Sequence, residues 1–213
     1  MEIFSVKSFL GKNNRSGQGL LEVTMAIGII ILGLLGIMSL TTASFGAAAE
    51  AEDRILATNL AREGLEAVRS LRDDSWLQGS STAWYNQLSG GGDLTAMPVL
   101  DPITFAWSFD FTPNSLQEAL SIVWRDQNSL FRQSSFPISG SPTLYARLMT
   151  FYPICRDVLT GSEASDAASC QSGYTQVGVR ALASVSWSRH GSHTITLENF
   201  LYNWRYSTDG YAP

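Results

Sequence analysis

The residue whose type and position most strongly suggest chemistry is Glu22. It immediately precedes an apolar run, residues 23–40, that contains no charged residue and no proline. A carboxylate carried to the centre of a bilayer costs on the order of 2.5–3.5 kcal/mol, so a lone acid here needs a functional reason or a shallow position. Glu22 is therefore a candidate functional residue, and a position at the level of the lipid headgroups is the alternative.

The two cysteines, Cys155 and Cys170, enclose a loop rich in serine, alanine and glycine. In an exported domain such a pair predicts a disulfide, and two reduced cysteines or a redox pair are the alternatives. Closing a loop of this length would stabilise the domain by about 3 kcal/mol through chain entropy.

The sequence contains no pattern typical of catalysis. It has no nucleophile elbow, no HExxH, no phosphate loop and no dinucleotide-binding glycine pattern, so we expect neither an enzyme nor a cofactor. His190 and His193 flank a predicted turn. We interpret them as solvated hairpin residues rather than as a metal site.

Charge is distributed unevenly along the 213 residues. The net charge is −5, and the absence of a basic stripe argues against nucleic acid as a partner. Residues 1–17 nevertheless carry Lys7, Lys12 and Arg15 against Glu2. Basic residues ahead of an apolar run predict a cytoplasmic N-terminus and an extracytoplasmic bulk.

The apolar run is about long enough to cross a bilayer, and several interpretations compete. A signal anchor would hold an external domain on one transmembrane helix. A secretory signal peptide could be cleaved near the small residues 47–49, but its apolar core would be only about 7–15 residues long.

A third interpretation comes from residues 17–23, GQGLLEV. This segment, behind a basic leader, resembles the class III signal of type IV prepilins and pseudopilins. The resemblance implies cleavage between Gly17 and Gln18, N-methylation of Gln18, and pairing of Glu22 with the new α-amine of a neighbouring subunit. Phenylalanine is usual at the first mature position, where this sequence has Gln18.

The resemblance also implies partners and a location. The partners would be other pilin subunits, a prepilin peptidase and an inner-membrane assembly platform with its ATPase. The subunit would cross the inner membrane once, with its head outside, and then enter a cell-surface or periplasmic filament. A mature length of 196 residues (213 − 17) favours a minor pilin. The alternative is a membrane-anchored extracytoplasmic binding domain that does not polymerise.

Helix-forming residues continue past the apolar run, without proline, to about residue 71. We expect a leader over 1–17, a helix over 18–77 that is transmembrane at about 20–42, and a head over 78–213. The second half of the helix carries an apolar stripe for packing on the head. Glycines in the first half would allow close helix approach or be merely tolerated in lipid: Gly28, Gly33, Gly36 and Gly46. Residues 60–77 also resemble the end of this helix in prepilin-like proteins.

Alternating apolar residues predict most of the head. After an exposed loop over 79–101, we expect strands at 103–111, 144–152 and 177–187, the last joined by a turn to 193–197. Residues 119–134 fit a hairpin or a short helix capped by Asn114 with Gln117. These elements predict an α+β fold in which the helix lies across a mostly antiparallel sheet of four or five strands. Residues 185–205 resemble the closing hairpin of prepilin-like proteins. A set of aromatic residues fits core packing or, alternatively, a surface for sugars or peptides: Trp107, Trp187, Phe200, Tyr202, Trp204 and Tyr206.

Overall fold

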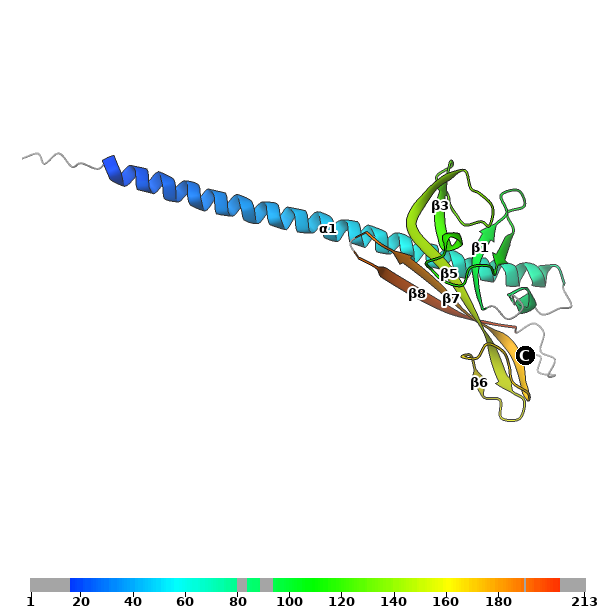
Figure 1. The fold of residues 1–213 in the computed structure, drawn as a ribbon. Helices are drawn as coiled ribbons and strands as arrows, with labels where there is room; N and C mark the ends of the chain where they lie inside the picture. Colours follow the sequence, from blue (N-terminus) through cyan, green and yellow to red (C-terminus); the bar gives the residue numbers. More distant parts are fainter. Residues whose placement is uncertain (1–15, 80–83, 89–93, 190, 204–213) are drawn as a thin grey trace, which may run out of the picture. The chain divides into compact units, whose positions relative to one another are not determined.

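The computed structural model describes residues 16–79, 84–88, 94–189 and 191–203. Its first element is one long helix, α1 (Ser16–Leu77), which a glycine with positive φ, Gly79, follows. The chain divides into two units within this helix, Met1–Ala49 and Glu50–Pro213. The second unit holds all the strands and the last part of α1 (Figure 1).

The strands form one eight-stranded sheet in which every pairing is antiparallel. Strand β5 is the longest, and β7 pairs with it along most of its length on one edge. On the other edge β5 meets β3, β1 and β6 in turn, while β8 pairs with β7. The bounds are β1 (Thr95–Leu100), β2 (Trp107–Asp110), β3 (Ile122–Asp126), β4 (Phe131–Arg132), β5 (Gly140–Asp157), β6 (Glu163–Ala164), β7 (Tyr174–Trp187) and β8 (His193–Tyr202).

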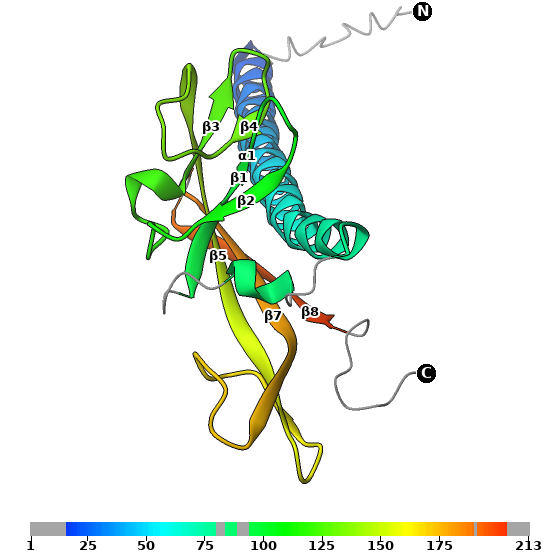
Figure 2. The same ribbon diagram turned by 90° about the vertical axis from the view of Figure 1, so that its right-hand side faces the viewer.

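The core of the second unit is formed by side chains of α1 and of the sheet. Figure 2 shows the ribbon of this unit from a second direction. The predicted apolar stripe is buried at Ala57, Leu60, Ala61, Leu65 and Val68. It packs in one cluster with side chains of β5, β7 and β8. The α+β prediction, a helix on an antiparallel sheet, is therefore confirmed, although the sheet has more strands than expected.

The prediction of an exposed loop over residues 79–101 is wrong for most of the described residues in this range. Residues Trp84–Leu88 form a short 3-10 helix, η1, whose Trp84 and Leu88 are buried, and β1 follows it with Ala96 and Met97 in the core. The glycines and Pro98 of this stretch indicated a loop. Pro98 fits in β1 opposite Phe109 of β2.

The prediction of a strand over residues 103–111 is also wrong for the first half of this range. Only Trp107–Asp110 is a strand, because the Asp101 carboxylate accepts hydrogen bonds from the N–H groups of Ile103 (2.7 Å) and Thr104 (3.1 Å) and closes a turn. Ile103 is 85% exposed, so the alternation there does not reflect burial.

Of the two alternatives for residues 119–134, the hairpin is observed, formed by β3 and β4. The helix capped by Asn114 is absent from this described stretch. A three-residue 3-10 turn, η2 (Ala119–Ser121), with Glu118 at its N-cap takes its place.

Candidate functional site

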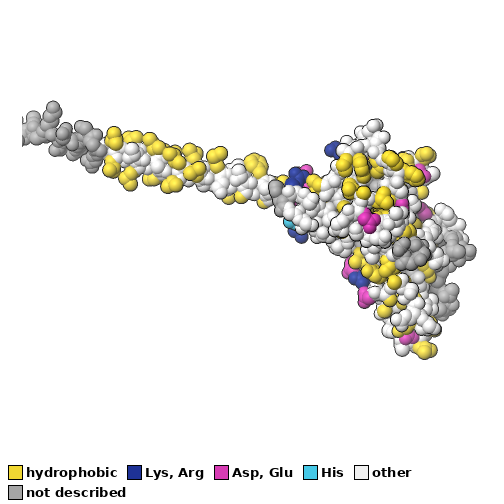
Figure 3. Space-filling view, in the orientation of Figure 1, with side chains coloured by type: hydrophobic (Ala, Val, Ile, Leu, Met, Phe, Trp, Pro, Cys, Tyr) yellow, Lys and Arg dark blue, Asp and Glu magenta, His cyan; other side chains and the backbone are white. Residues whose placement is uncertain are grey.

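The apolar part of α1 presents its side chains outward all round. Each large apolar side chain from Leu20 to Leu40 is at least half exposed, and Phe45 is 71% exposed. Hydrophobic side chains cover much of the face of this segment seen in Figure 3. An exposed apolar surface of this extent marks a contact with lipid or with another protein. By length and composition this helix can cross a membrane.

Glu22 lies on this segment and is exposed like its neighbours. The backbone of Gly17 and Gln18 belongs to the first turn of α1. The side chain of Gln18, and residues 1–15 of the expected leader, lie outside the described residues. Among the described residues, none forms a hydrogen bond or ion pair with the Glu22 carboxylate.

In the second unit, α1 is joined to the sheet by a buried arginine. Arg147 of β5 is 1% exposed, and its Nε donates to Gln133 Oε1 at 2.8 Å. Its Nη1 donates to the Leu60 carbonyl (3.0 Å) and to Glu63 Oε2 (3.1 Å), both on α1. Burial lowers the pKa of the guanidinium, and the Glu63 carboxylate opposes that effect. Because a buried charge is costly unless paired, these bonds fix one position of the helix along β5.

A second buried polar contact joins α1 to β5 and to the residues that follow β7. Asp53 of α1 is 1% exposed and accepts hydrogen bonds from the Tyr145 hydroxyl (2.8 Å) and from Arg189 Nη2 (3.0 Å). Burial and the bond to Asp53 raise the pKa of Tyr145 well above its usual value. The two polar contacts lie on the same face of α1. They hold the second part of this helix to the sheet at two points along the helix.

Sequence reasoning missed both contacts, although the sequence carries a sign of each. Arg147 has the same parity in its strand as Tyr145 and Met149, which are core residues. Asp53 lies four residues, or about one helical turn, before Ala57 and therefore on the same buried stripe. A charged residue that shares the period of the core residues is a candidate for a buried pair.

The cysteines meet as the sequence predicts. A disulfide joins Cys155 and Cys170 and closes a loop that includes β6. No group of three or more possible metal ligands occurs among the described residues. His193 stacks on Trp187 and lies 3.7 Å from Glu50 Oε1, while His190 lies outside the described residues.

The aromatic set does not form one surface. Trp187 is buried and Trp107 is half-buried, whereas Phe200 (45%) and Tyr202 (38%) are exposed on β8. Trp204 and Tyr206 lie outside the described residues. Core packing is therefore observed for Trp187, whereas a surface for sugars or peptides remains an untested alternative.

Comparisons of the chain with models of known protein families, with curated proteins and with solved structures find no match. The features that bear on function are thus those of the chain itself. The first feature is the outward-facing apolar part of α1, which carries Glu22 near its start. The second is a head to which the later part of the same helix is bound by buried polar contacts.

Proposed function

We propose that this chain is a structural subunit, a minor pilin, of a type IV pilus-like filament. It would polymerise through α1 after its leader is removed between Gly17 and Gln18. The observation that carries the proposal is the apolar part of α1, whose large side chains are all outward-facing and which bears Glu22 at its start. The resemblance of residues 17–23 to the prepilin signal supports the same function.

The chemistry of assembly follows from charge. Leader removal would create a positive α-amine on Gln18, four residues before Glu22. In a filament, the Glu22 carboxylate of one subunit would pair with the α-amine of its neighbour. An acid that is costly alone in lipid and stabilised by a partner favours docking in one axial register. The apolar side chains would exchange lipid contacts for contacts with identical helices, and the glycines would permit close approach.

The head would be carried by the second part of α1. Two buried contacts, centred on Asp53 and Arg147, hold that part to the sheet. Membrane localisation before assembly, an extracytoplasmic head and a later place in a surface or periplasmic filament belong to the same proposal. So do its partners: other pilins, the prepilin peptidase and the inner-membrane assembly platform.

A Glu22→Ala variant tests the assembly role in native cells. We expect normal insertion, but a loss of roughly tenfold or more in filament incorporation, because a pairing worth about 2 kcal/mol or more would be removed. The measurement is the ratio of subunit in sheared filaments to subunit in membranes. Glu52→Ala, which removes an exposed glutamate further along the same helix, is the matched control.

The rival function is a monomeric binding domain held by a single membrane anchor. It requires only that α1 be apolar and long enough to span a bilayer. Under that function Glu22→Ala would behave like Glu52→Ala, and no subunit would be found in filaments. That result would show that Glu22 has no role in assembly.

A further inference from the structure

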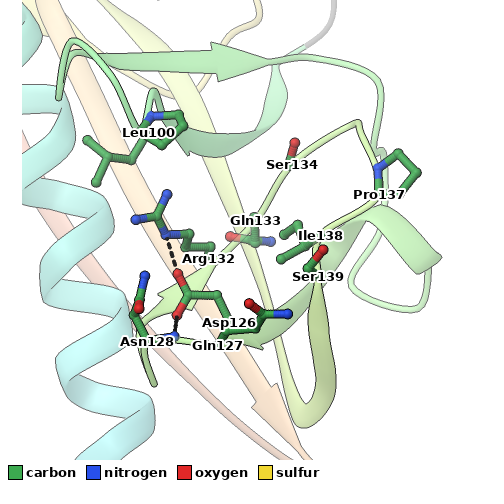
Figure 4. A pocket seen from close by; sticks show the side chains of 11 residues that line it. Leu100, Asp126, Gln127, Asn128, Arg132, Gln133, Ser134, Pro137, Ile138 and Ser139 are labelled. Atoms are coloured by element: carbon green, nitrogen blue, oxygen red, sulfur yellow. Dashed lines mark hydrogen bonds and ion pairs between the residues drawn. The ribbon is translucent and has the colours of Figure 1, made fainter.

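The head contains a pocket of about 330 Å³ that none of the functions above uses. It lies between the β3–β4 hairpin, the segment that leads from β4 to β5, and the end of β1. In Figure 4, Arg132, Asp126 and Asn128 lie along one side, and Ser134, Pro137, Ile138 and Ser139 lie along the other. Its volume is near the lower limit of ligand pockets, about 300–1,000 Å³, so it suits a small ligand.

The hairpin side of the pocket is held in place before any ligand arrives. Asp126 Oδ1 accepts hydrogen bonds from the N–H groups of Asn128 (2.8 Å) and Leu130 (2.9 Å). Its Oδ2 lies 2.9 Å from Arg132 Nε, and both side chains are mostly buried. Ser129 has a φ of 64°, a left-handed conformation that these bonds maintain.

Several polar groups around the pocket have no hydrogen bond to the described part of the chain. They are the terminal nitrogens of Arg132, the side-chain amides of Gln127 and Asn128, and the Ser139 hydroxyl. Each amide both donates and accepts, and the guanidinium offers planar paired donors. The pocket therefore presents unengaged donors and acceptors on a fixed frame.

We propose that this pocket binds a neutral sugar residue. Adjacent sugar hydroxyls both donate and accept, which matches the amides, the guanidinium and Ser139. Because Asp126 and Arg132 neutralise each other, the pocket has no net charge with which to select an ion. An apolar ligand would bury the amides without partners, which is costly.

The rest of the lining suits the carbon face of a sugar ring. Leu100, Pro102, Pro137 and Ile138 supply apolar surface to the same pocket. Phe136, the neighbour of Pro137 in the chain, is 80% exposed and adds an aromatic ring to this loop. The lining thus combines hydrogen-bonding groups with apolar surface, which suits a ligand that has both hydroxyl groups and an apolar ring face.

The test uses the full chain in detergent micelles on an array of immobilised neutral saccharides with hexose, N-acetylhexosamine and deoxyhexose ends. Sialylated and sulfated saccharides serve as the charged comparison. We expect retention on at least one neutral class. A Gln127→Ala/Asn128→Ala double variant should lose roughly tenfold or more in affinity, since two hydrogen-bonding groups are removed.

Two further variants keep the result unambiguous. Ser139→Trp fills the pocket from the side opposite the hairpin and should abolish binding without touching Asp126 or Arg132. Gln171→Ala removes an exposed amide directly after Cys170, outside the pocket lining, and should bind like the unaltered chain. Retention of no neutral saccharide by the folded chain, retention of charged ones only, or equal binding by every variant would overturn the proposal.

Discussion

The two parts of α1, before and after Ala49, belong to one helix but differ in what their apolar side chains contact. Before Ala49 the large apolar side chains are exposed all round the helix. After Glu50 most apolar residues form a stripe buried against the sheet, and the exposed face is mainly polar or charged, with Ile55 and Leu77 as exposed apolar exceptions. The first pattern needs a partner outside the described chain, and the second finds its partner within the head.

Polar residues in the two parts differ in the same way. Asp53 of the second part, and Arg147 of β5, which bonds to that part, are buried and bonded to residues of the same chain. Glu22 is exposed among apolar neighbours. If this contrast reflects function, changes after Glu50 should alter the stability of the head, and changes before Ala49 should alter assembly alone.

The largest effect on stability is expected from Arg147→Ala. This change leaves the Gln133 side chain and Glu63 without their shared partner inside or beside the core. Each buried polar group left without a partner costs about 1–3 kcal/mol of the free energy of unfolding, and the cavity left by the side chain adds to this cost. Denaturant unfolding of the full chain in detergent measures it.

The control for that variant is Arg69→Ala. Arg69 pairs with Glu66 on the exposed face of α1, and surface pairs contribute only about 0–1 kcal/mol. Equal effects of the two variants would mean that Arg147 is not a buried contact between helix and sheet.

A pair of identical glycine substitutions sharpens the comparison directly. A Cβ at Gly64 would lie 2.7 Å from the Met149 sulfur, whereas at Gly33 it would meet nothing within 4 Å in the described chain. We expect Gly64→Val to destabilise the head by about 1–3 kcal/mol through overpacking. Gly33→Val should leave head unfolding unchanged and lower filament incorporation, because it obstructs close helix approach. A destabilised head in the Gly33 variant would contradict the contrast between the two parts.

The smallest effect concerns alkaline pH. The pKa of Tyr145 is raised above its usual 10.0 in the folded protein by burial and by Asp53. The folded state then holds this proton more tightly than the unfolded state, so stability is full below about pH 10 and falls as pH rises, by up to about 1.4 kcal/mol per pH unit.

Tyr145→Phe should flatten this decline, as measured by unfolding free energies between about pH 8 and pH 11. The decline should not vanish, because burial of Tyr85 and the bond of Tyr202 to Glu163 raise the pKa of those groups as well. An unchanged slope would show that Tyr145 is not held by Asp53.

The sequence predicted those elements whose apolar period matches their burial. The strand expected at 177–187 lies in β7, and those expected at 144–152 and 193–197 are parts of the longer β5 and β8. Alternation failed at Ile103, because a side-chain bond from Asp101 decides the local backbone and leaves the apolar residues exposed. Such a local bond does not appear in a hydrophobic pattern.

The candidate site was predicted unevenly for a similar reason. Glu22 stands out because it interrupts an apolar stretch. Asp53 and Arg147 share the period of core residues, but their partners lie far away in the sequence and are identified only in the folded structure. The pocket beside Asp126 depends on a hairpin and a loop brought together by the fold, so residue types alone did not indicate it.

The central claim, that the apolar part of α1 is an assembly helix exposed by processing, is tested most directly by mass spectrometry. The intact protein and its N-terminal peptide would be measured from native membranes and sheared filaments. We predict a 196-residue chain (213 − 17) that begins at Gln18 and carries one added methyl group. A chain that begins at Met1 would indicate a simple anchor, and one that begins near Glu50 a secreted protein, and either would contradict the claim.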